Sequence, residues 1–124
     1  MSFSGSMIIT LFIASAATAV SQILFKQGTI TVMTNHASEP LARRLIELLA
    51  IPSFILGVFL YGSALLLWIW LLSKTSLSIL YPIGLSLNVV LALLAARFFL
   101  NETISPIHIA GVAIIILGIF IVAR

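Results

Sequence analysis

The chain has 124 residues, of which 62% are hydrophobic and only 7% are charged, and its formal net charge is +3. A soluble domain of this size covers its surface with far more charge, so the composition excludes that class and indicates an integral membrane protein. Cysteine is absent, which excludes disulfides, and the two histidines, His36 and His108, are too far apart in the sequence to indicate a metal site. We expect one all-α domain, residues 1–124, forming a membrane four-helix bundle that pairs as a dimer and has no cofactor.

The first predicted membrane span covers residues 7–25 and carries one stripe of polar side chains. Ser15, Thr18, Gln22 and Lys26 follow one another at steps of three, four and four residues, which places them on one face of a helix. A Gln is costly inside a span, and the opposite face of this helix is apolar. The stripe indicates either helix–helix contacts with a lysine anchor at the membrane surface, or the lining of a polar cavity, which we favour.

Small residues around Ala14–Ser15–Ala16 and Ala17–Thr18–Ala19 resemble the cleavage site of a signal peptide. No Lys or Arg precedes them, however, and the apolar run continues to Phe25. We therefore expect this span to remain in the protein as a membrane helix.

The connection over residues 28–50 divides into two halves. The first half is polar and β-branched, and we expect a loop there. The second half predicts a helix with Ser38 as its cap and Pro40 in its first turn, because leucines then share one face and Arg43, Arg44 and Glu47 share the other. This amphipathic pattern favours a helix on the membrane surface with Arg43 and Arg44 near lipid phosphates, the alternative being a lead-in turn to the next span.

The second span covers residues 51–72, and its Tyr61 and Trp68 are seven residues apart on one face, a spacing that favours packing or an interfacial aromatic belt. The third span covers residues 77–100. Its Tyr81, Gly84 and Asn88 share a face, and Pro82 frees a backbone carbonyl one turn into the helix. Asn88 lies near the middle of the span, where it either bridges helices or binds a polar substrate group.

The fourth span covers residues 106–123 and follows a short polar break. Ser105 is a suitable cap and Pro106 a suitable first helical residue, so we expect the helix to begin there. Gly111 and Gly118 are seven residues apart on one face. Small residues at such spacing let another backbone approach closely, so this face predicts the dimer interface.

Charge gives a weak signal for orientation and a clear one for mechanism. Four basic residues lie at or near one side of the membrane and two at the other, a bias that favours both termini outside: Lys26, Arg43, Arg44 and Arg97 against Lys74 and Arg124. The dispersed basic residues indicate topology and phosphate contacts, with no nucleic-acid partner.

The three acidic residues, Glu39, Glu47 and Glu102, all lie outside the spans, which argues against a proton pump with an intramembrane carboxylate. No nucleophile–base pair or phosphate loop is present, so we do not expect an enzyme.

The segment over residues 81–122 resembles the second half of drug/metabolite-transporter superfamily proteins. More narrowly, it resembles the four-helix, EamA-like subunits of the undecaprenyl-phosphate-aminoarabinose flippase. The matching pieces are Tyr81-Pro82, Ser86-Leu87-Asn88, Ala95-Ala96, Asn101-Glu102, Ser105-Pro106, His108, Gly111 and Gly118, with Ser21-Gln22 and Lys26-Gln27 in the first span. The small multidrug resistance branch shares the four-helix plan, but Thr18 stands where its essential Glu lies and Gly84 where its Trp lies.

The resemblance implies an inner-membrane transporter subunit that moves a polyprenyl-phosphate lipid or lipid-linked sugar between leaflets, as a homodimer or as a heterodimer with a similar subunit. Lys26, with Arg43 or Arg44, would then neutralise the phosphate of undecaprenyl phosphate or its glycoside. Thr18, Gln22, Tyr81 and Asn88 would line the path of the headgroup. Two alternatives stay open: a small multidrug-type exporter of a polar or cationic metabolite, and a non-transporting assembly subunit of a membrane glycosyltransferase.

Overall fold

The computed structural model describes residues 4–124, apart from the side chain of residue 123. Within this range the chain forms helices and no strand: α1 (Gly5–Asn35), α2 (Leu41–Leu48), α3 (Pro52–Lys74), α4 (Leu77–Phe99) and α5 (Pro106–Ala123). Three of them, α1, α3 and α4, are long and apolar enough to cross a membrane, and α5 is a shorter apolar helix. The prediction of an all-α membrane protein is therefore confirmed.

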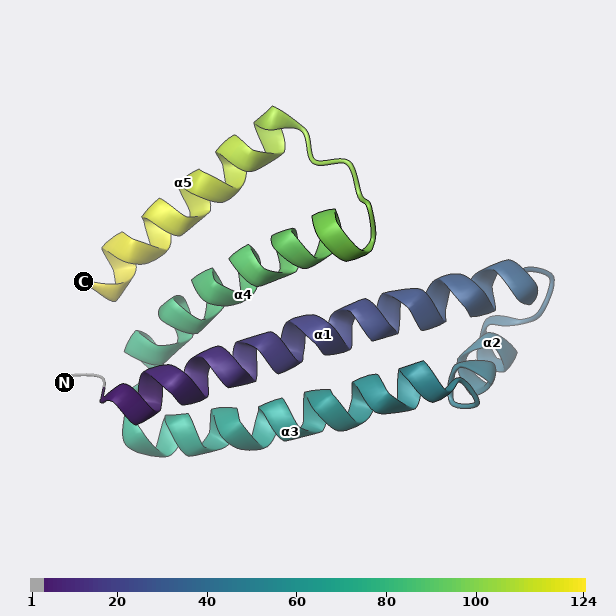
Figure 1. Cartoon of the computed structure of the whole chain (residues 1–124), viewed down its shortest axis with the longest axis horizontal. Helices are drawn as coiled ribbons and strands as arrows, with labels where there is room; N and C mark the ends of the chain where they lie inside the picture. Colours follow the sequence, from purple (N-terminus) through teal and green to yellow (C-terminus); the bar gives the residue numbers. More distant parts are fainter. Residues whose placement is uncertain (1–3) are drawn as a thin grey trace.

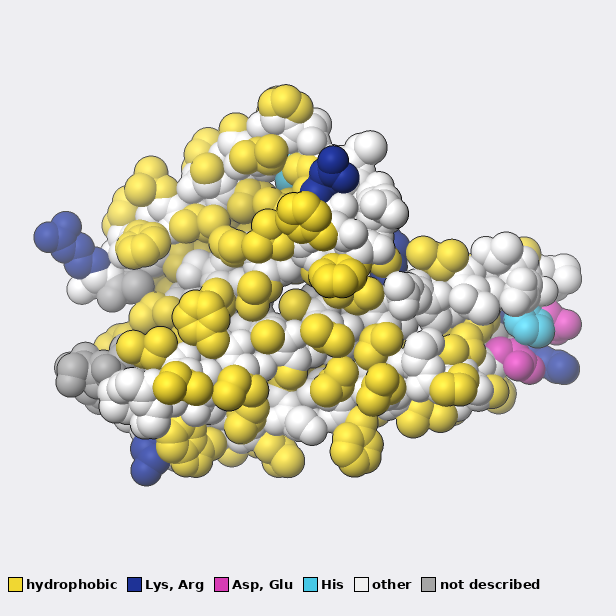
Figure 2. All heavy atoms as spheres, viewed as in Figure 1, with side chains coloured by type: hydrophobic (Ala, Val, Ile, Leu, Met, Phe, Trp, Pro, Cys, Tyr) yellow, Lys and Arg dark blue, Asp and Glu magenta, His cyan; other side chains and the backbone are white. Residues whose placement is uncertain are grey.

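The four long helices lie side by side in the order α5, α4, α1, α3 (Figure 1). Helix α1 contacts α3 along its length and α4 on its other side, whereas α5 packs mainly on α4. The beginning of α1, the end of α5 and the short α3–α4 connection lie at one end of the molecule, and α2 and the α4–α5 connection lie at the other. Hydrophobic side chains cover most of the visible face, with charged groups mostly toward the two ends (Figure 2), as expected for a surface in contact with lipid.

Two clusters of apolar side chains hold the helices together. A Cβ placed on Gly57 of α3 would lie 3.0 Å from Cε1 of Phe25, so the missing side chain lets α1 and α3 approach closely. The Phe25 ring also lies 5.2 Å from that of Phe54. At the other end of the bundle, Leu71 and Leu80 are fully buried in a cluster with Met7 and Leu11.

The loop expected directly after the first span is wrong, because α1 continues as a helix to Asn35. Its 31 residues span about 46 Å, which exceeds the ~30 Å hydrocarbon thickness of a bilayer. The last turns are helical because they have packing partners: Val32 is 2% exposed, and Gly28 lies against Phe54 and Leu48. Tertiary packing thus overrides the weak helix propensity of the β-branched residues in this segment.

The structure confirms a helix in the second half of the connection but changes its start. Pro40 is the N-cap residue of α2 without a side-chain hydrogen bond, so neither Ser38 nor Pro40 has its predicted place. The predicted start of α5 is confirmed, because Ser105 Oγ accepts a hydrogen bond from the backbone N–H of His108 at 3.2 Å and Pro106 is the first helical residue. The location of α2 on the membrane surface stays a prediction.

Candidate functional site

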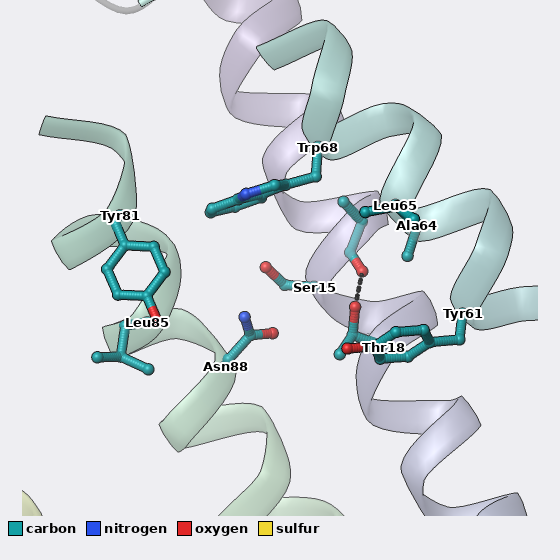
Figure 3. A pocket seen from close by; sticks show the side chains of 10 residues that line it. Ser15, Thr18, Tyr61, Ala64, Leu65, Trp68, Tyr81, Leu85 and Asn88 are labelled. Atoms are coloured by element: carbon teal, nitrogen blue, oxygen red, sulfur yellow. Dashed lines mark hydrogen bonds between the residues drawn. The ribbon is translucent and has the colours of Figure 1, made fainter. Parts of the chain in front are cut away.

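A cavity of about 190 Å³ opens between α1, α3 and α4 near the middle of these helices (Figure 3). Asn88, which points into it, is the twelfth of the 23 residues of α4. None of its lining side chains is charged: Ala14, Ser15, Thr18, Tyr61, Ala64, Leu65, Trp68, Tyr81, Leu85 and Asn88. Three residues predicted from the sequence to line a path for the headgroup, Thr18, Tyr81 and Asn88, therefore share this cavity.

Two polar atoms in this cavity are buried without a partner. Ser15 Oγ and Asn88 Oδ1 make no hydrogen bond to any described residue, and Ser15 is 2% exposed. Thr18 differs, because its hydroxyl donates to the carbonyl of Ala14 at 2.8 Å. An unpaired buried polar group costs roughly 1–3 kcal/mol. Ser15 and Asn88 are thus the groups here that gain most from a bound ligand or partner.

Three aromatic side chains complete the wall of the cavity: Tyr61 and Trp68 from α3, and Tyr81 from α4 (Figure 3). The sequence favoured packing or a membrane belt for Tyr61 and Trp68, and Tyr61 does pack on Phe25, with ring centroids 6.1 Å apart. Both residues also line the cavity, which the sequence interpretation missed. Gly84 was the residue in the sequence that could have indicated this position of Trp68. Its missing side chain leaves the space that the Trp68 indole occupies.

Replacing Gly84 with Ala is expected to destabilise the protein by about 1–3 kcal/mol, because the new methyl group overpacks against the Trp68 ring. Thermal unfolding in detergent measures the loss, and the emission of Trp68 in a Trp70→Phe background reports its displacement. Gly62→Ala is the matched control, since nothing lies near a Cβ at that helical position. Equal effects of the two substitutions would contradict the packing of Trp68 against Gly84.

A second, smaller cavity of about 150 Å³ follows along α1 toward the α2 end of the molecule. It contains two more of the predicted residues, Gln22 and Lys26, which face small residues of α4. Lys26 Nζ lies 3.4 Å from Oε1 of Glu102, and both side chains are about half exposed, at 54% and 43%. Exposed ion pairs are worth only about 0–1 kcal/mol, so this pair is easily exchanged for another partner.

The turn after α4 explains why Glu102 reaches Lys26. Asn101 has a φ of 52°, in the left-handed region that Asn tolerates better than most residues. The backbone N–H of Glu102 then donates to the carbonyl of Ala96 at 3.0 Å, which closes the end of α4. The sequence analysis placed Glu102 outside the spans and missed its pairing with Lys26 of α1.

Arg43 and Arg44 lie apart from both cavities. Arg43 Nε is 3.7 Å from Oε1 of Glu47, one turn along α2. The Arg44 guanidinium donates to Sδ of Met33 at 3.2 Å, against the end of α1. The structure therefore brings five of the seven predicted substrate-binding residues to the α1–α4 interface, and it leaves these two arginines at the α2 end of the molecule.

Gly111 and Gly118 lie on an open face of α5. Both are exposed, and a Cβ built on either would meet no atom within 4 Å. Beside α5, a third cavity of about 450 Å³ opens between α1, α4 and α5 and is lined almost entirely by apolar side chains: Ile8, Leu11, Phe12, Ile83, Ser86, Leu87, Val90, Ile116 and Phe120. Among the described residues, both glycines thus have open space beside them, as an intermolecular surface requires.

Apolar membrane-crossing helices around an uncharged polar cavity, with a lysine in the neighbouring cavity along α1, fit a multi-pass membrane transporter. The chain is 38% identical over 101 residues to a protein of Aeromonas salmonicida, covering 82% of each chain, and 33% identical over 113 residues to one of Proteus mirabilis, covering 91% of this chain and 93% of that one. Both bear the name "Probable 4-amino-4-deoxy-L-arabinose-phosphoundecaprenol flippase subunit ArnE". The chain belongs to this ArnE family of bacterial inner-membrane proteins.

An uncharacterized protein of Sinorhizobium fredii, y4nH, is 31% identical over 120 residues and is covered over 94% of its length. No family model matches the chain. No solved structure matches it significantly either.

Proposed function

We propose that this chain is one subunit of a flippase that moves a sugar-carrying polyprenyl phosphate between the leaflets of the inner membrane. The observation that carries the proposal is sequence similarity, over most of the chain, to proteins named as subunits of a 4-amino-4-deoxy-L-arabinose-phosphoundecaprenol flippase. The substrate class is taken from those names. The lipid would cross unchanged, so the proposed activity is transport without covalent chemistry.

The physical problem for such a flippase is the headgroup, because a phosphate and a sugar are strongly disfavoured in hydrocarbon. The polar stripe of α1 offers a path: Thr18, Gln22 and Lys26 follow one another at about 6 Å intervals along the helix. Lys26 would neutralise the phosphate, and Gln22 would bridge from it toward Thr18, Tyr81 and Asn88 at mid-depth. Glu102 would serve as the partner of Lys26 while no phosphate is bound.

The two arginines of α2 would act earlier, at the membrane surface. Basic residues near an anionic membrane surface contribute about 1 kcal/mol each to lipid attraction. Arg43 and Arg44 lie at the same end of the molecule as Lys26, with Leu41, Leu45 and Ile46 exposed beside them for insertion among lipid chains. We infer that they gather the phosphate lipid near Lys26 rather than hold it in the cavity.

The proposed flippase needs a second subunit. Four helices do not enclose a path on all sides, and larger transporters contain two related halves. The partner would be a second copy or a similar four-helix chain, docked on the α5 face that carries Gly111 and Gly118. The names of the relatives, which call each protein a subunit, support an assembly of more than one chain.

Native mass spectrometry of the purified chain tests the substrate class. We expect retention of undecaprenyl phosphate carrying 4-amino-4-deoxy-L-arabinose at lipid concentrations where phosphatidylglycerol, an anionic lipid without either group, has dissociated. Equal retention of the two lipids would reject a specific headgroup site.

A further inference from the structure

The mid-membrane cavity between α1, α3 and α4 contains groups that suit a particular kind of ligand. Ser15 Oγ and Asn88 Oδ1 are buried there without a hydrogen-bond partner among the described residues, on opposite walls formed by α1 and α4 (Figure 3). A hydroxyl can donate or accept, and a carboxamide offers both a donor and an acceptor. A ligand that satisfies both walls must therefore carry donors as well as acceptors.

A phosphate does not meet this requirement. Near neutral pH it offers mainly acceptor oxygens, and no Lys, Arg or His lines this cavity to balance its charge. An unpaired anion in a low-dielectric site is strongly disfavoured. The cation at this interface is Lys26, two helical turns further along α1 and lining the neighbouring cavity.

The aromatic side chains favour a sugar ring. Tyr61, Trp68 and Tyr81 surround the two unpaired atoms, and aromatic faces bind the C–H surfaces of sugars as well as cations such as a protonated amine. The volume of about 190 Å³ is below the ~300–1,000 Å³ of pockets that hold drug-sized ligands. It suits one ring and excludes a whole glycolipid.

We propose that Ser15, Asn88 and Trp68 form a sugar subsite, separate from the phosphate site at Lys26, an inference that rests on the proposed function. Thr18 and Lys26 are about 12 Å apart along α1, and helical side chains lean toward the N-terminus, so the lysine head lies near the level of Gln22. The two cavities lie one after the other along α1, so one lipid could place its sugar in the first cavity and its phosphate in the second. Recognition of the sugar would then distinguish the glycosylated lipid from bare undecaprenyl phosphate.

The test compares two probes on the full-length chain by native mass spectrometry: undecaprenyl phosphate and the same lipid carrying 4-amino-4-deoxy-L-arabinose. We expect Ser15→Ala with Asn88→Leu to weaken binding of the glycosylated lipid roughly tenfold or more, on the scale of two lost hydrogen bonds, and to leave undecaprenyl phosphate within about twofold. Ser63→Ala is the matched control, since its hydroxyl bonds within α3, to the carbonyl of Phe59, and lines no cavity described above.

The thermal midpoint gives a second readout that guards against misfolding. Asn88→Leu removes a buried oxygen that has no partner among the described residues, so we expect an unchanged or higher midpoint without lipid together with weaker sugar binding. A lower midpoint would indicate that Asn88 holds helices together and would overturn the subsite. Equal losses for both probes would also overturn it while leaving the proposed flippase intact. Failure of the wild-type chain to bind either probe would instead reject the proposed function itself.

Discussion

Replacing Lys26 with Gln is expected to lower the affinity for undecaprenyl phosphate by roughly 10- to 150-fold, the ~1.5–3 kcal/mol that a hydrogen bond to a charged group contributes. No other lysine lies on the polar stripe of α1, and both arginines of α2 already contact other groups, Glu47 and Met33. Native mass spectrometry or equilibrium binding with reconstituted protein measures the loss.

Glu102→Gln should act in the opposite direction. It removes the carboxylate that pairs with Lys26 at 3.4 Å and so frees the lysine for phosphate. The gain is small, because an exposed pair is worth about 0–1 kcal/mol.

Lys74→Gln is the matched control for Lys26→Gln. It also removes one positive charge, but at the other end of the molecule, where Lys74 lies 5.8 Å from the Trp70 ring. Equal affinities of the wild type and Lys26→Gln for undecaprenyl phosphate would show that Lys26 does not bind the phosphate and serves only as a membrane anchor.

The double substitution Gly111→Leu plus Gly118→Leu is expected to abolish the association of this chain with its partner. Membrane helices associate by close backbone packing at small residues, and two leucines would hold a facing helix away from α5. Both positions have open space around them, so the fold of the single chain should persist. Crosslinking in native membranes measures the association, and thermal unfolding verifies the fold.

Gly62→Leu provides the control for this pair. Gly62 is also exposed with nothing near its Cβ, but it lies on α3, on the far side of the helix layer from α5. Crosslinked species that persist at wild-type levels in the α5 double variant would place the interface elsewhere.

The membrane helices were predictable because few physical rules decide them. Long apolar runs must become helices in lipid, where every backbone group needs an internal partner. The beginning of α5 followed from Ser105 and Pro106, whose roles as cap and first residue depend only on neighbouring residues. The alignment of Thr18 with Lys26 on one face likewise depends only on helical periodicity.

The features that the sequence did not predict depend on contacts between distant segments. Helix α1 extends to Asn35 because Gly28 packs against Leu48 and Phe54. The Lys26–Glu102 pair needs the left-handed turn at Asn101, which no periodic pattern encodes. The aromatic wall of the cavity depends on the fit of Trp68 over Gly84, a contact between two different helices.

The most direct test of the account follows the sugar amine across a membrane. The assembly is purified from its native membranes through a tag on this chain and is placed in phosphatidylcholine vesicles with undecaprenyl phosphate carrying 4-amino-4-deoxy-L-arabinose. A membrane-impermeant amine reagent then labels only the lipid in the outer leaflet, with or without an imposed proton gradient. The account predicts that the wild-type assembly exposes the inner-leaflet lipid to the reagent and that the Lys26→Gln assembly leaves it protected. Inner-leaflet lipid that stays protected with the wild-type assembly in both conditions would contradict a role in flipping.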